Sequence, residues 1–222
     1  MYILAFDTTA ASCSVCLLKN DVLVAKSNER MEFGQAEYLL PEIKRMIDSV
    51  KIKFNQIGII SVCVGPGSFT GVRASISAAR AFGIANRSLP IVGVSAFETY
   101  LYGIAPDELA EVNAVIIETK REDFYYQLFD KNKNKINEPT TGYRDEILAE
   151  LRGKKVTVLG DGVERFLYSP TGLSLHAIKI DLYPPVENVA LCGMKKYKEG
   201  IRDFPKPLYL RAPEINCGCP TA

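Results

Sequence analysis

The sequence predicts an α/β protein made of two related halves, in which strands alternate with helices. Three apolar strand patterns occupy the first thirty residues, and a glycine-rich turn later joins a buried strand to a helix of small residues. A shorter variation on the same plan begins near Pro106. With 222 residues, the chain is long enough for one large domain or two small ones.

The composition is that of an ordinary globular protein. Hydrophobic residues make up 47% of the chain and charged residues 24%, and the formal net charge is +1. No strong overall field therefore draws the protein to nucleic acid or membrane. The apolar runs are too short for a transmembrane helix, and Met1–Asp7 lacks the basic start of a signal peptide. We expect a cytoplasmic protein with no membrane contact.

The six cysteines and the single histidine do not indicate a disulfide framework or a zinc site. Cys13, Cys16 and Cys63 lie in apolar strand patterns, where a reduced cysteine acts as a small hydrophobe. Cys13 and Cys16 have redox-motif spacing, but residues three apart on a strand face opposite sides. The Cys217–Cys219 segment lies in a tail, and His176 is the only histidine. We therefore expect no bound metal ion.

The first half is predicted to contain five strands, at Tyr2–Asp7, Ser12–Leu18, Val22–Ser27, Phe54–Val64 and Pro90–Val94. A helix over Gly34–Val50 carries apolar residues at three- and four-residue spacings. Pro41 lies inside that pattern and removes one hydrogen bond, so we expect a kink there or a start nearer Leu40. Two further helices are expected over Thr70–Arg87 and Ala96–Ile104.

The second half repeats this plan in shorter form. Strands are expected at Asn113–Glu118, Phe124–Asp130 and Lys155–Leu159, and helices at Asp145–Leu151 and Val186–Glu199. Lys131–Lys135 is expected to be a solvated hairpin tip, and Leu208–Arg211 a final extended piece. The predicted domains are residues 1–104, joined by a C-terminal return near 186–211, and residues 105–185; residues 212–222 are a tail.

The most informative stretch is the glycine loop, Gly65–Arg73. A sharp glycine turn before a helix presents backbone N–H groups and the positive end of a helix dipole, which suits a phosphate or another anion. The loop matches neither the P-loop nor the dinucleotide fingerprint, because no lysine follows Gly71 and the glycine spacing differs. A tight turn that allows close helix packing is the alternative interpretation.

The helix after the loop has a stripe of small residues, at Ala74, Ala78, Ala81 and Ala85. Their spacing places them on one face, so another helix or a sheet can approach closely there. Such a face is either part of the core or, where it is exposed, a docking surface for another protein.

These motifs together resemble the TsaB (YeaZ) family of bacterial accessory proteins in tRNA threonylcarbamoyladenosine biosynthesis. The glycine loop is the most specific match, and the others in chain order are Ile3–Thr9, Glu37–Ile43, Pro90–Ser95 and Tyr209–Arg211. The resemblance covers nearly the whole chain. It implies the actin-like ATPase fold shared by actin and sugar kinases, with two domains that each hold a five-stranded mixed sheet flanked by helices.

The resemblance also implies a function. Proteins of this family look like degenerate relatives of the catalytic subunit TsaD, with which they pair to place threonylcarbamoyl on the adenosine beside the tRNA anticodon. A small ATPase, TsaE, is a further expected partner, tRNA is expected to bind through the complex, and a homodimer is another option. No tightly bound cofactor is expected, since ATP and magnesium would belong to the partners.

Within that resemblance, the residues indicate a non-catalytic role. The catalytic relative has two histidines four residues apart on a helix, which can bind one metal ion. Ala96 and Tyr100 stand in those places, and Glu98 alone cannot hold the ion. Phe33 and the Glu118-Thr119-Lys120 turn depart from the family pattern, and this turn has no glycine for close phosphate approach. We predict no catalytic residue and no metal ligand.

Two functional hypotheses of different classes follow. A scaffold would bind its partner through the helices at Gly34–Val50 and Thr70–Arg87, with an interface made by Leu39, Ile43, Met46, Ile47, Ala74, Ala78, Ala81 and Ala85. Alternatively, both helices bury these residues against the chain's own sheet. An actin-like kinase or ATPase acting on a small molecule would hold phosphate with Asp7, Thr8, Thr9, Gly65, Gly67 and Ser68.

A peptidase has the least support, because no nucleophile turn is recognised and His176 lies in a strand-like context. Direct contact with tRNA stays open. The second half could form a diffuse basic surface from Lys120, Arg121, Lys131, Lys133, Lys135, Lys154 and Lys155.

Overall fold

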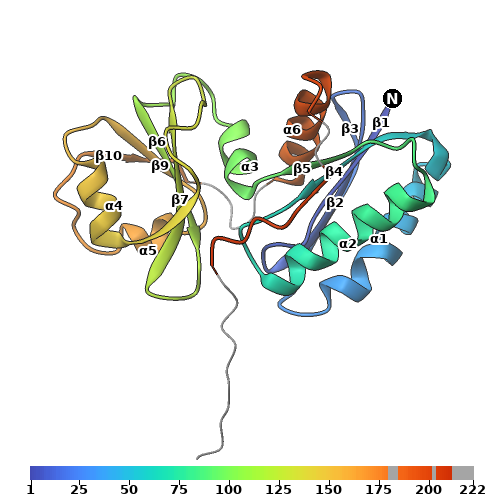
Figure 1. Cartoon of the computed structure of the whole chain (residues 1–222), viewed down its shortest axis with the longest axis horizontal. Coiled ribbons are helices and arrows are strands. Elements are labelled where there is room, and N and C mark those ends of the chain that lie inside the picture. The colour runs from blue at the N-terminus through green and yellow to red at the C-terminus, as the bar shows by residue number, and fades with distance from the viewer. Residues whose placement is uncertain (180–184, 202–203, 212–222) are drawn as a thin grey trace, which may run out of the picture.

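Two five-stranded mixed sheets lie side by side, each covered by helices (Figure 1). The computed structural model of the chain describes residues 1–179, 185–201 and 204–211. The predicted tail, residues 212–222, therefore lies outside the described residues. Of the helices in the described part, none is long and apolar enough to cross a membrane.

The first domain is built on a sheet with the strand order β3-β2-β1-β4-β5. Its strands are β1 (Tyr2–Asp7), β2 (Ser12–Lys19), β3 (Val22–Arg30), β4 (Ile57–Cys63) and β5 (Ile91–Val94). β1, β2 and β3 pair antiparallel, whereas β1, β4 and β5 pair parallel. The central strands are buried on both faces, which explains their nearly continuous apolar sequences.

Four helices cover the two faces of this sheet (Figure 1). Helices α1 (Gln35–Ser49) and α2 (Phe69–Ala85) pack on one face. A short 3-10 helix, η1 (Phe54–Gln56), lies between α1 and β4. Helices α3 (Ala96–Tyr102) and α6 (Val186–Lys198) lie on the other face. The chain thus returns to its first sheet after building the second.

Helix α1 corrects one of our expectations. It begins at Gln35, directly after Gly34 in the left-handed region at φ 87°, and not near Leu40. Pro41 lies inside the helix, where it lacks one backbone donor. The apolar stripe packs against the sheet, and this burial outweighs the lost hydrogen bond.

The second domain has the strand order β10-β9-β6-β7-β8. Its elements are β6 (Val112–Glu118), β7 (Asp123–Asp130), β8 (Thr140–Tyr143), α4 (Arg144–Leu151), β9 (Val156–Leu159), α5 (Val163–Phe166) and β10 (Leu175–Ala177). β6, β7 and β8 pair antiparallel, and β6, β9 and β10 pair parallel. Both domains therefore have the same topology, and the expected fold of two mixed sheets is confirmed.

The apolar core has three parts. One lies between the first sheet and α1 and α2, and another between the second sheet and α4 and α5. The third extends from the inner face of the first sheet through α3 and α6 to the second sheet, where it includes Val115, Ile117, Phe129 and Leu159. The two domains thus share buried apolar surface around α3.

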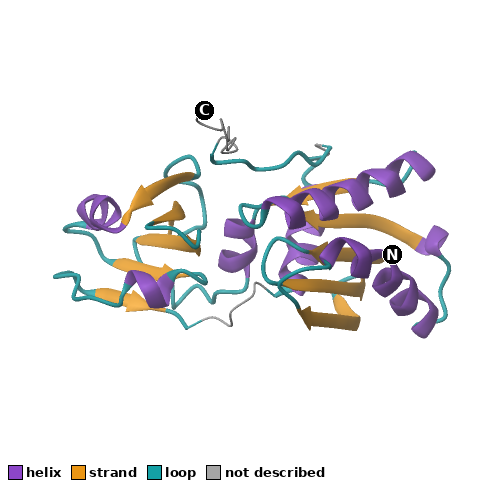
Figure 2. Ribbon diagram, turned by 90° about the horizontal axis from the view of Figure 1, so that it is seen from below, coloured by secondary structure: helices purple, strands orange, loops and turns teal. Residues whose placement is uncertain are grey.

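After α6, residues 204–211 run along the first domain and end beside the second (Figure 2). The Leu208 amide donates to the Val64 carbonyl at 2.8 Å, directly before the glycine loop. The segment predicted as a final extended piece therefore lies next to the most informative motif of the sequence.

Candidate functional site

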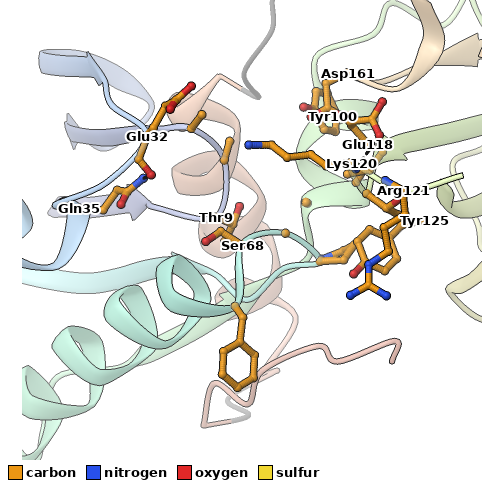
Figure 3. A pocket seen from close by; sticks show the side chains of 18 of the residues that line it. Thr9, Glu32, Gln35, Ser68, Tyr100, Glu118, Lys120, Arg121, Tyr125 and Asp161 are labelled. Carbon is orange, nitrogen blue, oxygen red and sulfur yellow. Dashed lines mark hydrogen bonds between the residues drawn. The ribbon is translucent and has the colours of Figure 1, made fainter. Parts of the chain in front are cut away.

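A cleft of about 520 Å³ lies between the two domains (Figure 3). The first domain contributes the β1–β2 turn, the glycine loop and the connection from β3 to α1. The second domain contributes the β6–β7 turn and the loop after β9, and α3 lines the cleft as well. Clefts between domains are common ligand sites, so the polar groups here decide what this one can do.

The chain's own backbone fills the glycine loop. A Cβ atom on Gly67 would overlap the carbonyl oxygen of Thr9, and one on Gly71 would overlap that of Thr8. The amide of Ser68 donates to the Thr9 carbonyl at 2.7 Å. The glycines therefore allow the loop to pack tightly on the β1–β2 turn, as in our alternative interpretation of a tight turn.

Side chains of the β1–β2 turn reinforce this closure. Thr8 Oγ1 donates to the Gly71 carbonyl at 2.6 Å, and the Thr8 amide donates to Ser75 Oγ at 3.1 Å. Ser68 caps α2 by accepting from the Gly71 amide at 3.3 Å. The side chains of Thr8 and Ser68 thus bind partners within the chain.

Asp7 is 3% exposed and lies behind the turn. Its Oδ1 accepts from the Thr9 amide at 2.7 Å. Burial raises the pKa of Asp7, which opposes the negative charge that a metal-bound phosphate site requires. Of the six residues predicted for an anion or nucleotide, Thr9, Gly67 and Ser68 line the cleft, whereas Asp7, Thr8 and Gly65 do not.

At the base of the cleft, α3 contacts the second domain through a polar pair. The Tyr100 side chain lies beside the carboxylate of Asp161 (Figure 3), and burial raises the pKa of Tyr100 well above its usual value. Asp161 Oδ1 accepts from the Glu118 amide at 3.0 Å. Burial, together with the nearby charge of Glu118, raises the pKa of Asp161 to about 6 and outweighs the hydrogen bonds that favour the carboxylate.

The role of Asp161 was not predicted. The sequence did contain a signal, because glycines flank Asp161 directly after a strand. A Cβ atom on Gly160 would overlap the Ile116 carbonyl oxygen, and Gly162 approaches the same residue. Both glycines let the loop after β9 pack on β6, which aims Asp161 at Tyr100.

Glu98 lies on α3 between Ala96 and Tyr100, the two positions that we compared with the histidines of the catalytic relative, and it has partners within the chain. Its carboxylate accepts from the Ser95 amide at 2.9 Å and pairs with Lys196 Nζ at 2.8 Å. Burial alone would raise the pKa of Glu98, but the Lys196 ammonium and the hydrogen bonds from Ser95 outweigh burial and lower this pKa. Among the residues that the structure describes, no three His, Cys, Asp or Glu side chains come close enough to share a metal ion.

The second-domain wall of the cleft carries charge. Lys120 extends from the β6–β7 turn toward the first domain (Figure 3), and Arg121 and Arg30 also line the cleft. Glu118 forms a two-pronged ion pair with Arg165, at 2.7 and 2.8 Å. The cleft is thus of mixed charge, with its acidic groups partly neutralised by partners.

One lysine of the predicted basic surface has a structural role. Lys133 does not lie in a fully solvated tip, because its ammonium donates to the carbonyls of Tyr102 and Ile104, at 3.0 and 2.8 Å. These carbonyls end α3, where a cation is favourable. The hairpin of the second domain thereby holds α3 from its C-terminal end, which the polar sequence alone did not indicate.

The predicted partner face on α1 and α2 requires a correction. Leu39, Ile43, Met46 and Ile47 are 1–8% exposed, and they pack against the chain's own sheet, as in our alternative for this face. Ala78 is also buried and Ala74 half-buried, whereas Ala81 and Ala85 are exposed. The four large apolar side chains therefore belong to the core beneath α1 and are not exposed to a partner.

An apolar groove remains open on this face. It lies between α1, η1 and α2 and has a volume of about 590 Å³. Leu40, which is 50% exposed, lines it together with Phe54 and Phe82, and Ile43 and Ile47 reach its floor. Ile84 on α2 is 73% exposed. This groove stands on the opposite side of the first sheet from α3 and α6.

Comparison with known proteins agrees with these observations. A model of the family "TsaD: tRNA N6-adenosine threonylcarbamoyltransferase" matches residues 34–159, more than half of the chain. The tRNA threonylcarbamoyladenosine biosynthesis protein TsaB of Escherichia coli K12 is 29% identical, over 95% of both chains. The protein of the same name from Buchnera aphidicola subsp. Schizaphis graminum is 26% identical, over 84% of this chain and 90% of its own.

Solved structures show the same fold. A protein from Pseudomonas aeruginosa described as similar to peptidase YEAZ superposes with a TM-score of 0.80 at 21% identity, over 95% of this chain and 99% of its own. A ROK hexokinase from Thermus thermophilus gives a TM-score of 0.55 at 10% identity, over 89% of this chain and 100% of its own. The fold is that of the actin-like ATPases. From its motifs, the family model and the proteins named TsaB, the chain belongs to the TsaB (YeaZ) family.

Proposed function

We propose that this protein is a non-catalytic accessory subunit in the biosynthesis of tRNA threonylcarbamoyladenosine, and that it activates a TsaD-type catalytic subunit by pairing with it. The observation that carries the proposal is the match to proteins named TsaB over 95% of both chains. Threonylcarbamoyl transfer to the adenosine next to the anticodon would take place on the partner, which also holds ATP and magnesium.

The cleft supports the non-catalytic part of the proposal. Where catalytic relatives are expected to have a metal-binding histidine, Tyr100 lies beside Asp161, and the neighbouring Glu98 forms an ion pair with Lys196. The glycine loop is closed by the backbone of Thr8 and Thr9. Residues that in an enzyme would hold a metal ion or a phosphate are here used to hold the two domains and α2 in place.

The α1–α2 face supports the pairing part. Ala81 and Ala85 are small and exposed, so a partner helix can approach α2 closely. Leu40 and Ile84 project large apolar side chains beside them. A TsaD-type partner of related fold would present a corresponding helix pair, and the two pairs would meet as a helical bundle. TsaE-type ATPase, tRNA and a second copy of this chain would join through that complex, in the cytoplasm.

The test replaces Ala81 with glutamate and measures binding to the TsaD-type subunit of the same organism by sedimentation velocity. Ala81→Glu places a charge and bulk on the proposed face, so we expect the heterodimer peak to be lost. Ala177→Glu, an equally exposed alanine in β10 of the second domain, is the matched control and should bind normally. Equal binding by both variants would contradict the proposed interface, provided both have the circular dichroism spectrum of the parent.

A further inference from the structure

The segment after α6 crosses from one domain to the other. We call residues 204–211 the C-terminal strap. It begins beside α2, passes the glycine loop and ends at the second domain (Figures 1 and 2). Its contacts with the two domains are of different kinds, and the strap itself does not line the cleft.

The first anchor lies on the middle of α2. Arg80 donates to the Pro205 carbonyl from Nη2 at 2.7 Å and from Nε at 3.2 Å. The same guanidinium lies 5.1 Å from the centre of the Phe204 ring. With the Leu208 amide bound to Val64, the first part of the strap is fixed to the first domain at two separate points.

The second anchor lies at the start of α2. The Tyr209 ring packs 5.4 Å from the Phe69 ring, and its hydroxyl accepts from Arg73 Nε at 3.0 Å. Arg73 lies 3.7 Å from the centre of the Phe69 ring. This arrangement gives Arg73 a role: it stabilises the strap, although its charge is unfavourable so near the positive end of the helix dipole.

The third anchor is on the other domain. The guanidinium of Arg211 forms an ion pair with Asp123 at the start of β7 and lies 5.7 Å from the centre of the Tyr125 ring. The side chains of Arg211 and Asp123 are 25% and 13% exposed, so solvent screens this pair less than a surface ion pair. Asp123 is itself positioned by the Thr119 hydroxyl, which donates to Oδ1 at 3.1 Å.

We infer that the C-terminal strap is a latch that restrains opening of the cleft between the two domains. Phe69, which Tyr209 contacts, and Tyr125, which Arg211 contacts, line the cleft from opposite walls. Separation of these walls would break the Arg211–Asp123 pair, while the anchors on α2 keep the strap in place. The shared core around α3 acts as the hinge side, and the strap closes the open side.

The experiment measures the distance between the two domains in the full-length protein. Nitroxide labels are attached at Asp21→Cys in the first domain and Lys154→Cys in the second, both exposed positions. Cys217 and Cys219 are changed to serine, and the four cysteines in the described part of the chain are buried. Double electron–electron resonance is expected to show a longer and broader distance distribution for Arg211→Gln than for the parent.

Further variants make the result specific. Lys195→Gln breaks an exposed ion pair with Glu199 at the end of α6 and should leave the distribution unchanged. Asp123→Asn should reproduce the shift of Arg211→Gln, and the double variant should add nothing to it. Arg211→Lys keeps the charge and should keep the parent distance.

If Arg211→Gln does not fold, Asp123→Asn makes the same comparison. An unchanged distribution in the folded variants, or an equal shift in Lys195→Gln, would overturn the latch. The result is independent of whether the protein pairs with a TsaD-type subunit, because no partner is present.

Discussion

The two domains have the same strand order but secure the same junction in different ways. In the first domain, the loop after β4 packs on the end of β1, and in the second, the loop after β9 packs on the end of β6. Gly71 approaches Thr8 in the first domain, and Gly160 approaches Ile116 in the second. A shared topology therefore brings glycine and backbone together at two places, one on each side of the cleft.

The junctions differ in what holds them. In the first domain, uncharged groups of the Thr8–Thr9 turn bind the glycine loop, which continues into the 17-residue helix α2. In the second, the charged residues Glu118, Arg165 and Asp161 do this work, and α5 has only four residues. The comparison teaches that one strand order can secure its glycine turn with uncharged groups in one domain and with charged groups in the other.

The largest expected effects come from the glycines themselves. Gly71→Ala and Gly160→Ala should each lower the free energy of unfolding by about 3 kcal/mol or more, because the added Cβ overlaps a backbone carbonyl. Gly153→Ala is the control, since a Cβ there meets nothing within 4 Å and only the positive φ of 77° costs about 1 kcal/mol. Urea denaturation compares all three, and a loss for Gly71→Ala no larger than the control would show that the first junction is loosely packed.

The second prediction concerns the charge on Asp161. Its pKa is about 6 in the folded protein against 3.8 for an ordinary aspartate, so the folded state favours the protonated form. This contribution to stability is fully present at a pH below the pKa of Asp161 in the unfolded chain, and it is lost as the pH rises through 6. It amounts to at most about 3 kcal/mol.

Asp161→Asn removes this dependence and should stabilise the protein at pH 7 by roughly 1–3 kcal/mol. Thermal denaturation at pH 4.5 and pH 7 measures the stability of parent and variant. The change in melting temperature between the two pH values should be smaller in the variant. A variant less stable than the parent at pH 7 would show that the carboxylate is well compensated.

The third prediction separates the two junctions by their response to salt. Thr8→Val removes two buried hydrogen bonds, to Gly71 and Ser75, and should cost about 1–3 kcal/mol at any ionic strength. Arg165→Gln breaks the half-exposed pair with Glu118 and should cost about 1 kcal/mol or less, falling as salt is added. Urea denaturation at low and high sodium chloride tests both. An equal salt response in the two variants would remove the distinction between the domains.

The smallest expected effect is on nucleotide binding. Since the glycine loop is filled by Thr8 and Thr9, isothermal titration of the isolated chain with ATP and magnesium should give no binding in the micromolar range. Micromolar binding that is lost in Lys120→Gln would instead favour an actin-like kinase or ATPase that uses the cleft.

The sequence predicted most of the fold because its signals are local. Apolar runs and helical periodicity located β1, β2, β4 and α1, and the repeated plan indicated two halves. The short elements β8 and α5 were not predicted, and for β10 only a strand-like context around His176 was noted, because three or four residues carry too little pattern. The predicted helix over Gly34–Val50 agrees with α1, whereas the alternative start near Leu40 was wrong because packing of the apolar face overrode the penalty of Pro41.

The site was less predictable, because it depends on contacts between distant parts of the chain. Tyr100 and Asp161 are brought together only by the packing of α3 on the second domain. Arg211 reaches Asp123 because the chain returns to the first domain through α6. The apolar stripe of α1 could equally face a partner or the sheet, and only the structure shows that it faces the sheet.

The most direct test of the account reconstitutes threonylcarbamoyl transfer to tRNA with the TsaD-type and TsaE-type proteins, ATP and magnesium. One rate is measured with the parent chain, one with the cleft variant Tyr100→Phe and one with the face variant Ala81→Glu. A non-catalytic partner predicts a rate close to the parent with Tyr100→Phe and a loss of the stimulated rate with Ala81→Glu. The opposite pattern, in which the cleft variant abolishes transfer and the face variant does not, would contradict the proposed function.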